Sequence, residues 1–338
     1  MRRRLALAHL PTPLQRPARL AARMGIDLVV KRDDMTGGAE AGNKIRKLEF
    51  LLGEAVEQGA DTVITCGGIQ SNHARATALL AASLGLRTIL FLRVPADQLE
   101  GGAPDPRKHA PPVGNVLLDR MAGAELRLIT PEQYQDRQAV MAAAASELSA
   151  AGLRPYVIPE GGSSGLGSLG YVEAMAEVRR QLDLGLAGGR PFDVIVHACG
   201  SGGTAAGVAL GAARYEVAAE VRAIAVCNDA RTFEVATEQI MNEARALDPS
   251  LGDAARLIID ESAKGPAYAV STPAQRRLII EVARLSGLVL DPVYTGKAFS
   301  ALWEQAAEEL QGKRVLFLHT GGLPGLLAQG AELAPDLD

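Results

Sequence analysis

The chain has 338 residues, 48% of them hydrophobic and 22% charged, the composition of an ordinary globular protein that is long enough for two domains. Its formal net charge of −4 lacks the basic footprint of a nucleic-acid-binding protein. No run reaches the roughly 18 apolar residues of a membrane span, so we expect no membrane or nucleic-acid partner and predict a cytoplasmic protein that acts on a small molecule.

Short β-branched runs alternate with longer alanine- and leucine-rich stretches, the pattern of an α/β protein with mainly parallel sheets. Strands are predicted at residues 26–31, 61–65, 86–93, 156–158, 194–196, 221–226, 288–290 and 315–318. Helices are predicted over residues 43–57, up to Ser83, over 138–151, from near Tyr171, and over 204–213 and 297–310, while runs 116–121, 126–129 and 278–285 continue the alternation. Residues 95–112 read as a surface loop, and the glycine-rich stretch 159–170 suits a crossover between domains.

A glycine-rich stretch leads into the first long helix, with Asn43 as its predicted N-cap. Lys44 then lies in the first turn, where the positive end of the helix dipole disfavours a cation by roughly 0.3–1 kcal/mol at exposed sites. A lysine that must present a neutral amine, as in Schiff-base chemistry, would gain from this position. The alternative is a solvated basic cluster with Arg46 and Lys47.

A second glycine-rich loop, Cys199 to Gly207, follows a predicted strand and opens a helix, so its backbone N–H groups converge on one point. This arrangement predicts an anion site, with a cofactor phosphate as the natural guest and the hydroxyls of Ser201 and Thr204 as added donors. The spacing Gly200-x-Gly202-x-x-Ala205 also fits a dinucleotide fingerprint with Asp229 as the ribose acid. Close packing of the glycines is a third interpretation.

Two further groups of polar residues fall on loops. Gln70-Ser71-Asn72-His73 lies at a strand-to-helix turn, where it would either bind a carboxylate or simply cap the helix. Tyr268 and Tyr294 lie on glycine- and proline-rich loops, where active-site groups of open α/β sheets gather, although loop tyrosines commonly just pack. The five histidines show no ligand spacing, and the three cysteines read as free thiols of a reducing compartment, so we expect no metal.

Seven motifs follow one another over nearly the whole chain: Lys31-Arg-Asp-Asp34, Gly42-Asn-Lys-Ile-Arg-Lys-Leu-Glu49, Gly68-Ile-Gln-Ser-Asn-His73, Gly161-Gly-Ser-x-x-Leu-Gly-x-Leu-Gly-Tyr171, Gly200-Ser-Gly-Gly-Thr204, Leu290-Asp-Pro-Val-Tyr-Thr-Gly-Lys297 and His319-Thr-Gly-Gly322. Together they resemble the pyridoxal-phosphate enzymes that comprise D-cysteine desulfhydrase and 1-aminocyclopropane-1-carboxylate deaminase, which disfavours the dinucleotide interpretation. The resemblance implies the tryptophan-synthase-β fold (fold type II), an α/β architecture with two open, twisted, mainly parallel sheets flanked by helices. It also implies a homodimer and a small domain, residues 47–162, inserted in a large one, residues 1–46 and 163–338.

The same resemblance implies roles for individual residues. Lys44 matches the lysine that holds pyridoxal 5′-phosphate, Asn72 the asparagine beside the cofactor's 3′-oxygen, and Thr320 the residue near the pyridine nitrogen in the desulfhydrase. The phosphate loop matches Gly200, Ser201, Gly202, Gly203 and Thr204. The residues expected at the amino-acid substrate are Gln70, Ser71, Asn72, His73 and Thr295, and the catalytic ones are Lys44, Ser71, Tyr268 and Tyr294.

We therefore expect a β-eliminating lyase that converts D-cysteine, or a close relative, to pyruvate, ammonia and the released thiol. The deaminases that resemble this chain typically carry Glu where Thr295 stands and Leu where Thr320 stands, which favours elimination over ring opening. The alternatives are the deaminase activity, an L-cysteate sulfo-lyase-like activity, and a pyridoxal-phosphate-binding protein without turnover.

Overall fold

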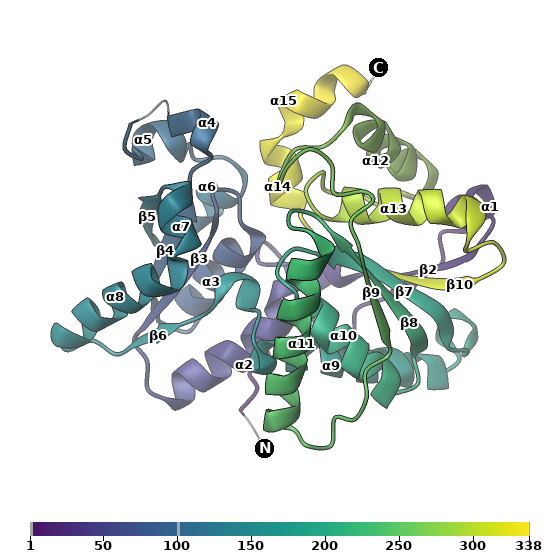
Figure 1. Ribbon diagram of the computed structural model, residues 1–338, viewed down its shortest axis with the longest axis horizontal. Coiled ribbons are helices and arrows are strands. Elements are labelled where there is room, and N and C mark those ends of the chain that lie inside the picture. Colours follow the sequence, from purple (N-terminus) through teal and green to yellow (C-terminus); the bar gives the residue numbers. More distant parts are fainter. Residues whose placement is uncertain (1–2, 100–101, 338) are drawn as a thin grey trace.

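The computed structural model describes residues 3–99 and 102–337, and its strands form two separate sheets flanked by helices (Figure 1). The larger sheet has six strands in the order β1-β2-β10-β7-β8-β9. Their bounds are β1 Leu14–Gln15, β2 Asp27–Lys31, β7 Phe192–Cys199, β8 Ala218–Ala225, β9 Arg256–Asp260 and β10 Arg314–Leu318. All neighbours in this sheet are parallel except β1 and β2. The predicted fold class is confirmed.

The smaller sheet has four parallel strands in the order β5-β4-β3-β6. They are β3 Thr62–Gly68, β4 Arg87–Arg93, β5 Glu125–Ile129 and β6 Pro155–Val157. In Figure 1 this sheet lies on the left and the six-stranded sheet on the right. The four strands fall within the predicted small domain, but its first boundary, after residue 46, cuts a continuous helix, so the domain limits stay a prediction.

The helices are α1 Ala18–Met24, α2 Lys44–Glu57, α3 Asn72–Ser83, α4 Ala96–Leu99, α5 Pro106–His109, α6 Gly114–Met121, α7 Pro131–Gln135, α8 Arg137–Ala150, α9 Gly165–Asp183, α10 Gly203–Arg214, α11 Ala230–Leu247, α12 Pro273–Ser286, α13 Thr295–Glu308, α14 Leu323–Ala328 and α15 Gly330–Leu333. Short 3₁₀ turns occupy Asp33–Met35, Glu160–Gly162, Leu186–Gly188 and Ala334–Asp336. Within residues 3–99 and 102–337, no helix is both long and apolar enough to span a membrane.

Several sequence-based expectations need correction. Residues 95–112 are not simply a loop, because α4 and α5 form there, and residues 288–290 pair with no strand in the described chain. Helix α9 begins at Gly165 rather than near Tyr171. The Ser164 hydroxyl accepts the Gly167 N–H and caps the helix. The sequence analysis assigned no element to several segments that are helices or strands in the structure, among them β1, β9, α1, α7, α11, α14 and α15.

The glycines at the start of α9 explain why a helix can form in a stretch that reads as a hinge. A Cβ on Gly170 would lie 2.1 Å from the Arg46 carbonyl oxygen, and one on Gly167 would lie 2.1 Å from the Gly162 oxygen. A side chain is excluded at Gly170 because α9 packs directly on α2, and at Gly167 because α9 packs on the turn Glu160–Gly162. In Figure 1, α2, α9, α10 and α11 lie between the two sheets.

The six-stranded sheet is covered on both faces. Along β10, Val315 and Phe317 join one hydrophobic cluster, whereas Leu316 and Leu318 join the cluster on the opposite face. A parallel sheet that is buried on both faces offers its carboxyl-terminal edge for ligands. A ligand site is therefore expected where β7 and β10 end.

Candidate active site

The start of helix α2 is held by contacts from distant segments. The Gly42 N–H donates to Thr36 Oγ1 (2.8 Å), and the Asn43 N–H donates to the Thr320 carbonyl oxygen (3.1 Å). Asn43 immediately precedes the helix, but its side chain makes no capping bond; Asn43 Nδ2 donates instead to Thr204 Oγ1 (3.1 Å). The predicted capping by the Asn43 side chain is thus wrong, and this side chain links α2 to the glycine-rich loop.

Lys44 is half-buried at this helix start, and burial lowers the pKa of its amine to about 8, although Glu160 and Cys199 oppose the shift. A neutral amine is therefore accessible near neutral pH. The sequence argument reached the same state through the helix dipole, whereas the leading cause is desolvation. The alternative of a solvated basic cluster is wrong, because Arg46 and Lys47 are each only 1% exposed.

The glycine-rich loop connects β7 to α10. Gly202 has φ of +83°, a left-handed conformation that favours glycine, and a Cβ on Gly200 would lie 3.1 Å from Tyr294 Cε1. The loop leads into the start of α10, and the backbone N–H groups at a helix N-terminus can bind an anion. The packing interpretation holds for Gly207, where a Cβ would lie 2.2 Å from the Ser168 carbonyl oxygen.

Lys47 is a residue of this region that the sequence argument treated only as part of a basic cluster. Its Nζ donates to the Gly161 carbonyl oxygen (3.0 Å) and to Ser163 Oγ (3.2 Å). Ser163 Oγ in turn contacts Ser201 Oγ (2.8 Å) and accepts the Gly203 N–H (3.2 Å). Burial lowers the pKa of Lys47 well below its usual value. The available signal was its spacing of three residues from Lys44, which puts both on one helix face.

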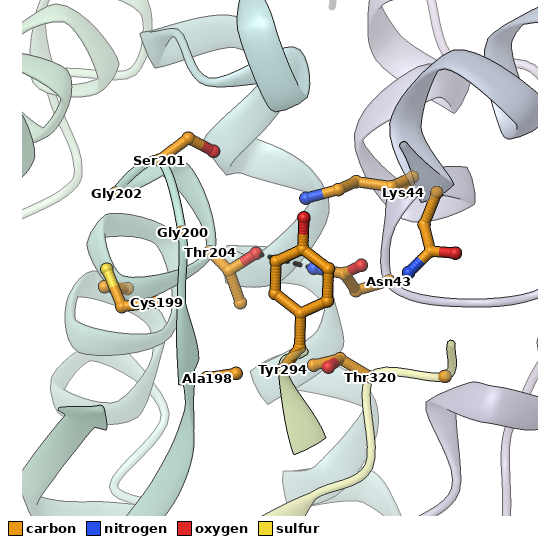
Figure 2. Close-up of a pocket in the computed structure, with 13 residues that line it drawn as sticks. Asn43, Lys44, Ala198, Cys199, Gly200, Ser201, Gly202, Thr204, Tyr294 and Thr320 are labelled. Carbon is orange, nitrogen blue, oxygen red and sulfur yellow. Dashed lines mark hydrogen bonds between the residues drawn. The ribbon is translucent and has the colours of Figure 1, made fainter. Parts of the chain in front are cut away.

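A narrow pocket collects most of the residues expected to hold the cofactor. Figure 2 shows the Lys44 amine and the Tyr294 hydroxyl directed into this pocket, with the glycine-rich loop on one side and Thr320 below. Its lining residues are Asn43, Lys44, Asn72, Ala198, Cys199, Gly200, Ser201, Gly202, Thr204, Ala205, Tyr294, Thr320 and Gly321. Residues from α2, α3, the β7–α10 loop and the segment after β10 therefore meet here.

A wider cavity of about 710 Å³ shares Lys44, Gly200, Ser201 and Tyr294 with the narrow pocket. Among its further lining residues are Ser71, His73 and Tyr268. The hydroxyls of Tyr268 and Tyr294 are 2.6 Å apart. Burial raises the pKa of Tyr268 to about 12 and that of Tyr294 well above its usual value, so both phenols stay protonated at neutral pH.

The turn before α3 has a defined hydrogen-bond pattern. Ser71 Oγ accepts the Ala74 N–H (3.2 Å), so the capping interpretation is right for Ser71, which also lines the wide cavity. The Thr65 hydroxyl donates to the Ile158 carbonyl oxygen, and therefore accepts the hydrogen of His73 Nε2 at 2.9 Å. Burial lowers the pKa of His73 well below its usual value, so the ring is neutral.

Three predicted site residues lie outside both cavities. Gln70 turns away, because its Oε1 accepts the Asn115 N–H (2.8 Å) and its Nε2 donates to the Val113 carbonyl oxygen (3.1 Å). Thr295 is fully buried, and its hydroxyl donates to Asp291 Oδ1 (2.6 Å). The backbone N–H of Gly203 donates to Ser163 Oγ.

These residues fit a phosphorylated aldehyde cofactor. The glycine-rich loop at the start of α10 lines the narrow pocket, and a half-buried amine with a pKa of about 8 lines the same pocket. Such an amine is suited to bind an aldehyde covalently. Among the described residues, no group of three or more His, Cys, Asp or Glu side chains is arranged to hold a metal ion.

Comparisons with known proteins agree with this geometry. A family model described as pyridoxal-phosphate dependent enzyme matches residues 5–321. The chain is 42% identical, over 97% of its length and 80% of the relative's, to a mitochondrial protein of Arabidopsis thaliana named bifunctional D-cysteine desulfhydrase/1-aminocyclopropane-1-carboxylate deaminase. It is 38% identical to D-cysteine desulfhydrase of Yersinia pestis, over 96% of this chain and 95% of the relative.

Among solved structures, a homologue of 1-aminocyclopropane-1-carboxylate deaminase superposes with a TM-score of 0.86 at 37% identity, covering 99% of this chain and 96% of the other. The match of fold and the match of sequence thus cover the same nearly complete length. Both include every segment that lines the two cavities. The chain belongs to the family of pyridoxal-phosphate dependent enzymes.

Proposed function

We propose that this enzyme is a β-eliminating lyase whose preferred substrate is D-cysteine, which it converts to pyruvate, ammonia and hydrogen sulfide. The observation that carries the proposal is the half-buried Lys44 amine, with its pKa near 8, in a cavity shared with a pair of protonated tyrosines. The names of the relatives, which include D-cysteine desulfhydrase, support the same chemistry.

In the proposed reaction, Lys44 Nζ removes the proton from the substrate Cα, since a neutral amine at this position is a competent base. Tyr294, whose hydroxyl contacts that of Tyr268, donates a hydrogen bond or a proton where the leaving group departs. Ser71 and Asn72 would orient the substrate and the cofactor, and the backbone of the loop between β7 and α10 would hold the phosphate. Pyridoxal phosphate, when bound, supplies an electron sink for the pair left at Cα.

The preference for elimination over ring opening rests on fewer residues than the sequence suggested. Thr320 lines the narrow pocket, but Thr295 lies against Asp291 and is fully buried. The argument that two threonines favour elimination therefore depends on Thr320 alone. The deaminases carry Leu at the Thr320 position, so Thr320 would place a neutral hydroxyl, and no charge, near the pyridine nitrogen, which suits a good leaving group such as a thiol.

The test is a product assay across D-cysteine, L-cysteine, β-chloro-D-alanine, L-cysteate and 1-aminocyclopropane-1-carboxylate. We expect kcat/KM for D-cysteine to exceed that for the cyclopropane substrate by at least about tenfold, on the order of 1.4 kcal/mol in barrier. The reverse preference would make the chain a deaminase. A protein that binds the cofactor but forms product from none of the five would be a binding protein without turnover.

The assembly and location expected from the sequence also belong to this proposal: a cytoplasmic homodimer, with residues 47–162 as a small domain inserted in a large one. Support for a dimer comes from exposed apolar side chains on two helices that contact each other, namely Leu117 and Met121 of α6 and Leu323 and Leu327 of α14. Light scattering should give twice the mass of one chain, and a monomer at micromolar concentration would contradict this part of the proposal.

A further inference from the structure

Arg93 lies at the edge of the sheet where the proposed substrate site is. It is the last residue of β4 and pairs in register with Gly68, the last residue of β3. Three residues after Gly68 comes Ser71, which lines the same wide cavity as Arg93. Because ligands bind at the carboxyl ends of parallel strands, the Arg93 guanidinium is at a position from which it can reach a bound amino acid.

The contacts of Arg93 are aromatic. Its Cζ lies 4.8 Å from the centroid of the Tyr134 ring and 5.6 Å from that of the Tyr268 ring. Within the part of the chain that the structure describes, none of the ion pairs or side-chain hydrogen bonds includes its guanidinium. The rings hold the cation in place while its N–H donors remain available to a ligand.

The other charges of this cavity have partners. The Arg137 Nε lies 2.9 Å from Glu160 Oε2, and Tyr134 donates a hydrogen bond to the same carboxylate. Glu243 Oε2 accepts the Gly165 N–H at 2.8 Å. Lys44 is the remaining cation besides Arg93, and its amine is used in the proposed reaction. Arg93 is thus the half-buried cation of this cavity whose donors are neither paired with a carboxylate nor used in the proposed reaction, so they can bind an anionic ligand.

The position of Arg93 relative to the reacting groups identifies the part of the substrate it would contact. Arg93 packs on Tyr268, whose hydroxyl reaches Tyr294, and Tyr294 lines the pocket of Lys44. The contacts run in the order Lys44, Tyr294, Tyr268, Arg93, so Arg93 is separated by two tyrosines from the amine that would act at Cα. A guanidinium there presents a planar fork of donors that matches a carboxylate or sulfonate.

We propose that Arg93 determines specificity by binding an anionic group on the substrate's Cβ, so that the substrates are small α-amino acids with an acidic or charge-developing β-substituent. The inference rests on the proposed function and defines its substrate class. In D-cysteine elimination the Cβ–S bond breaks, its electron pair leaves with sulfur, and Lys44 Nζ holds the Cα proton. The negative charge that develops on sulfur then faces Arg93.

The test uses the holoenzyme and two ligands that match in shape but differ in charge, aspartate and asparagine, each as both enantiomers. Their inhibition constants are measured against β-chloroalanine turnover. We expect the acid to bind at least about tenfold more tightly than the amide in the preferred enantiomer. Arg93→Gln should reduce that ratio to about two or less, and Arg93→Lys, which keeps the charge, should retain part of it.

Arg137→Gln is the matched control, because Arg137 packs on the same Tyr134 ring and lines the same cavity but is paired with Glu160. Its acid-to-amide ratio should stay within about threefold of the wild type. If Arg93→Gln weakens both ligands equally, Arg93 only supports the tyrosines and the proposal is wrong. An equal loss of the ratio in both variants would attribute the preference to net cavity charge and also overturn it.

The lyase function and the role of Arg93 can be refuted independently of each other. If the wild-type enzyme eliminates from none of the substrates tested, the proposed lyase function fails. The acid-to-amide ratio is then read from the change in the visible absorption of the holoenzyme on titration with aspartate and asparagine. If β-chloroalanine turns over but acid and amide bind equally well to the wild type, the lyase stands and the role of Arg93 is refuted.

Discussion

The pKa values of the cations on the two faces of helix α2 are shifted in opposite directions. On one face, Lys44 and Lys47 point toward the glycine-rich loop, and burial lowers the pKa of both. On the other face, Arg46 Nη2 lies 2.8 Å from Asp33 Oδ1 and 3.0 Å from Glu177 Oε1. Although burial opposes it, this pairing raises the pKa of Arg46 well above its usual value.

One face of α2 therefore stabilises the fold, and the other face carries the reactive amine. Arg46, Asp33 and Glu177 compensate one another inside the protein and join α2 to the end of β2 and to α9. Lys44 lacks such compensation, so its neutral form is stabilised and becomes available for reaction. A buried network that fixes the helix thus holds an uncompensated amine two residues away in position.

The largest effect should follow from removing the reactive amine of Lys44. Lys44→Ala should abolish the visible absorption of the cofactor-bound protein and lower elimination activity by at least about 10³-fold, because the variant lacks both the covalent attachment and the base. Absorption spectra and the pyruvate assay measure the two losses. A borohydride-reducible lysine adduct persisting in this variant would show that another lysine, such as Lys47, holds the cofactor.

On the supporting face, Arg46→Met should leave Asp33 buried without its paired cation, although Glu177 keeps Lys31, and should lower the free energy of unfolding by about 3–5 kcal/mol. Urea unfolding measures the change. Arg179→Met is the control, since Arg179 pairs with Asp183 at the surface and its loss should cost about 0.5 kcal/mol or less. A loss at Arg46 as small as that at Arg179 would remove the contrast between the faces.

The pH dependence of cofactor uptake tests the state of the Lys44 amine. Only the neutral amine reacts, so with a pKa of about 8 the uptake rate should rise about tenfold per unit at low pH and level off above about 9. An ordinary lysine, with a pKa of 10.5, would give a rate that still rises there. Stopped-flow mixing of the cofactor-free protein with pyridoxal phosphate, from pH 6 upward, separates the two profiles.

The smallest effect is expected at the link between α2 and the phosphate loop. Thr204→Val removes the hydroxyl that accepts from Asn43 Nδ2, and should weaken cofactor affinity about fivefold, on the order of 1 kcal/mol. Titration of the cofactor-free protein measures this.

Gly202→Val should weaken cofactor binding more than Thr204→Val does. Because Gly202 has φ of +83°, a side chain there also strains the backbone, so thermal unfolding must be measured alongside. Unchanged affinity in both variants would argue against a phosphate at this loop.

Sequence reasoning was most successful where the backbone itself makes the site. The glycine-rich loop between a buried strand and a helix was recognisable, because glycine spacing and apolar runs are local features. The place of Lys44 in the first turn was also predictable, since it depends only on where the helix begins. Thr295 was misplaced, because a threonine one residue after a loop tyrosine can face a cavity or a buried aspartate with equal ease.

By itself, the sequence determined the fold class, the order of most strands and helices, the family, and the two segments that bring an amine and a set of backbone donors together. Only the tertiary structure decided that Asn43 bonds Thr204 rather than capping its helix, that Gln70 turns to the segment 113–115, and that Arg93 enters the cavity without a counter-charge. The physical reason is the range of the interactions. Helix starts and strand periods are set by residues a few positions apart, whereas a polar side chain takes whichever partner the packing of distant segments brings within about 3 Å.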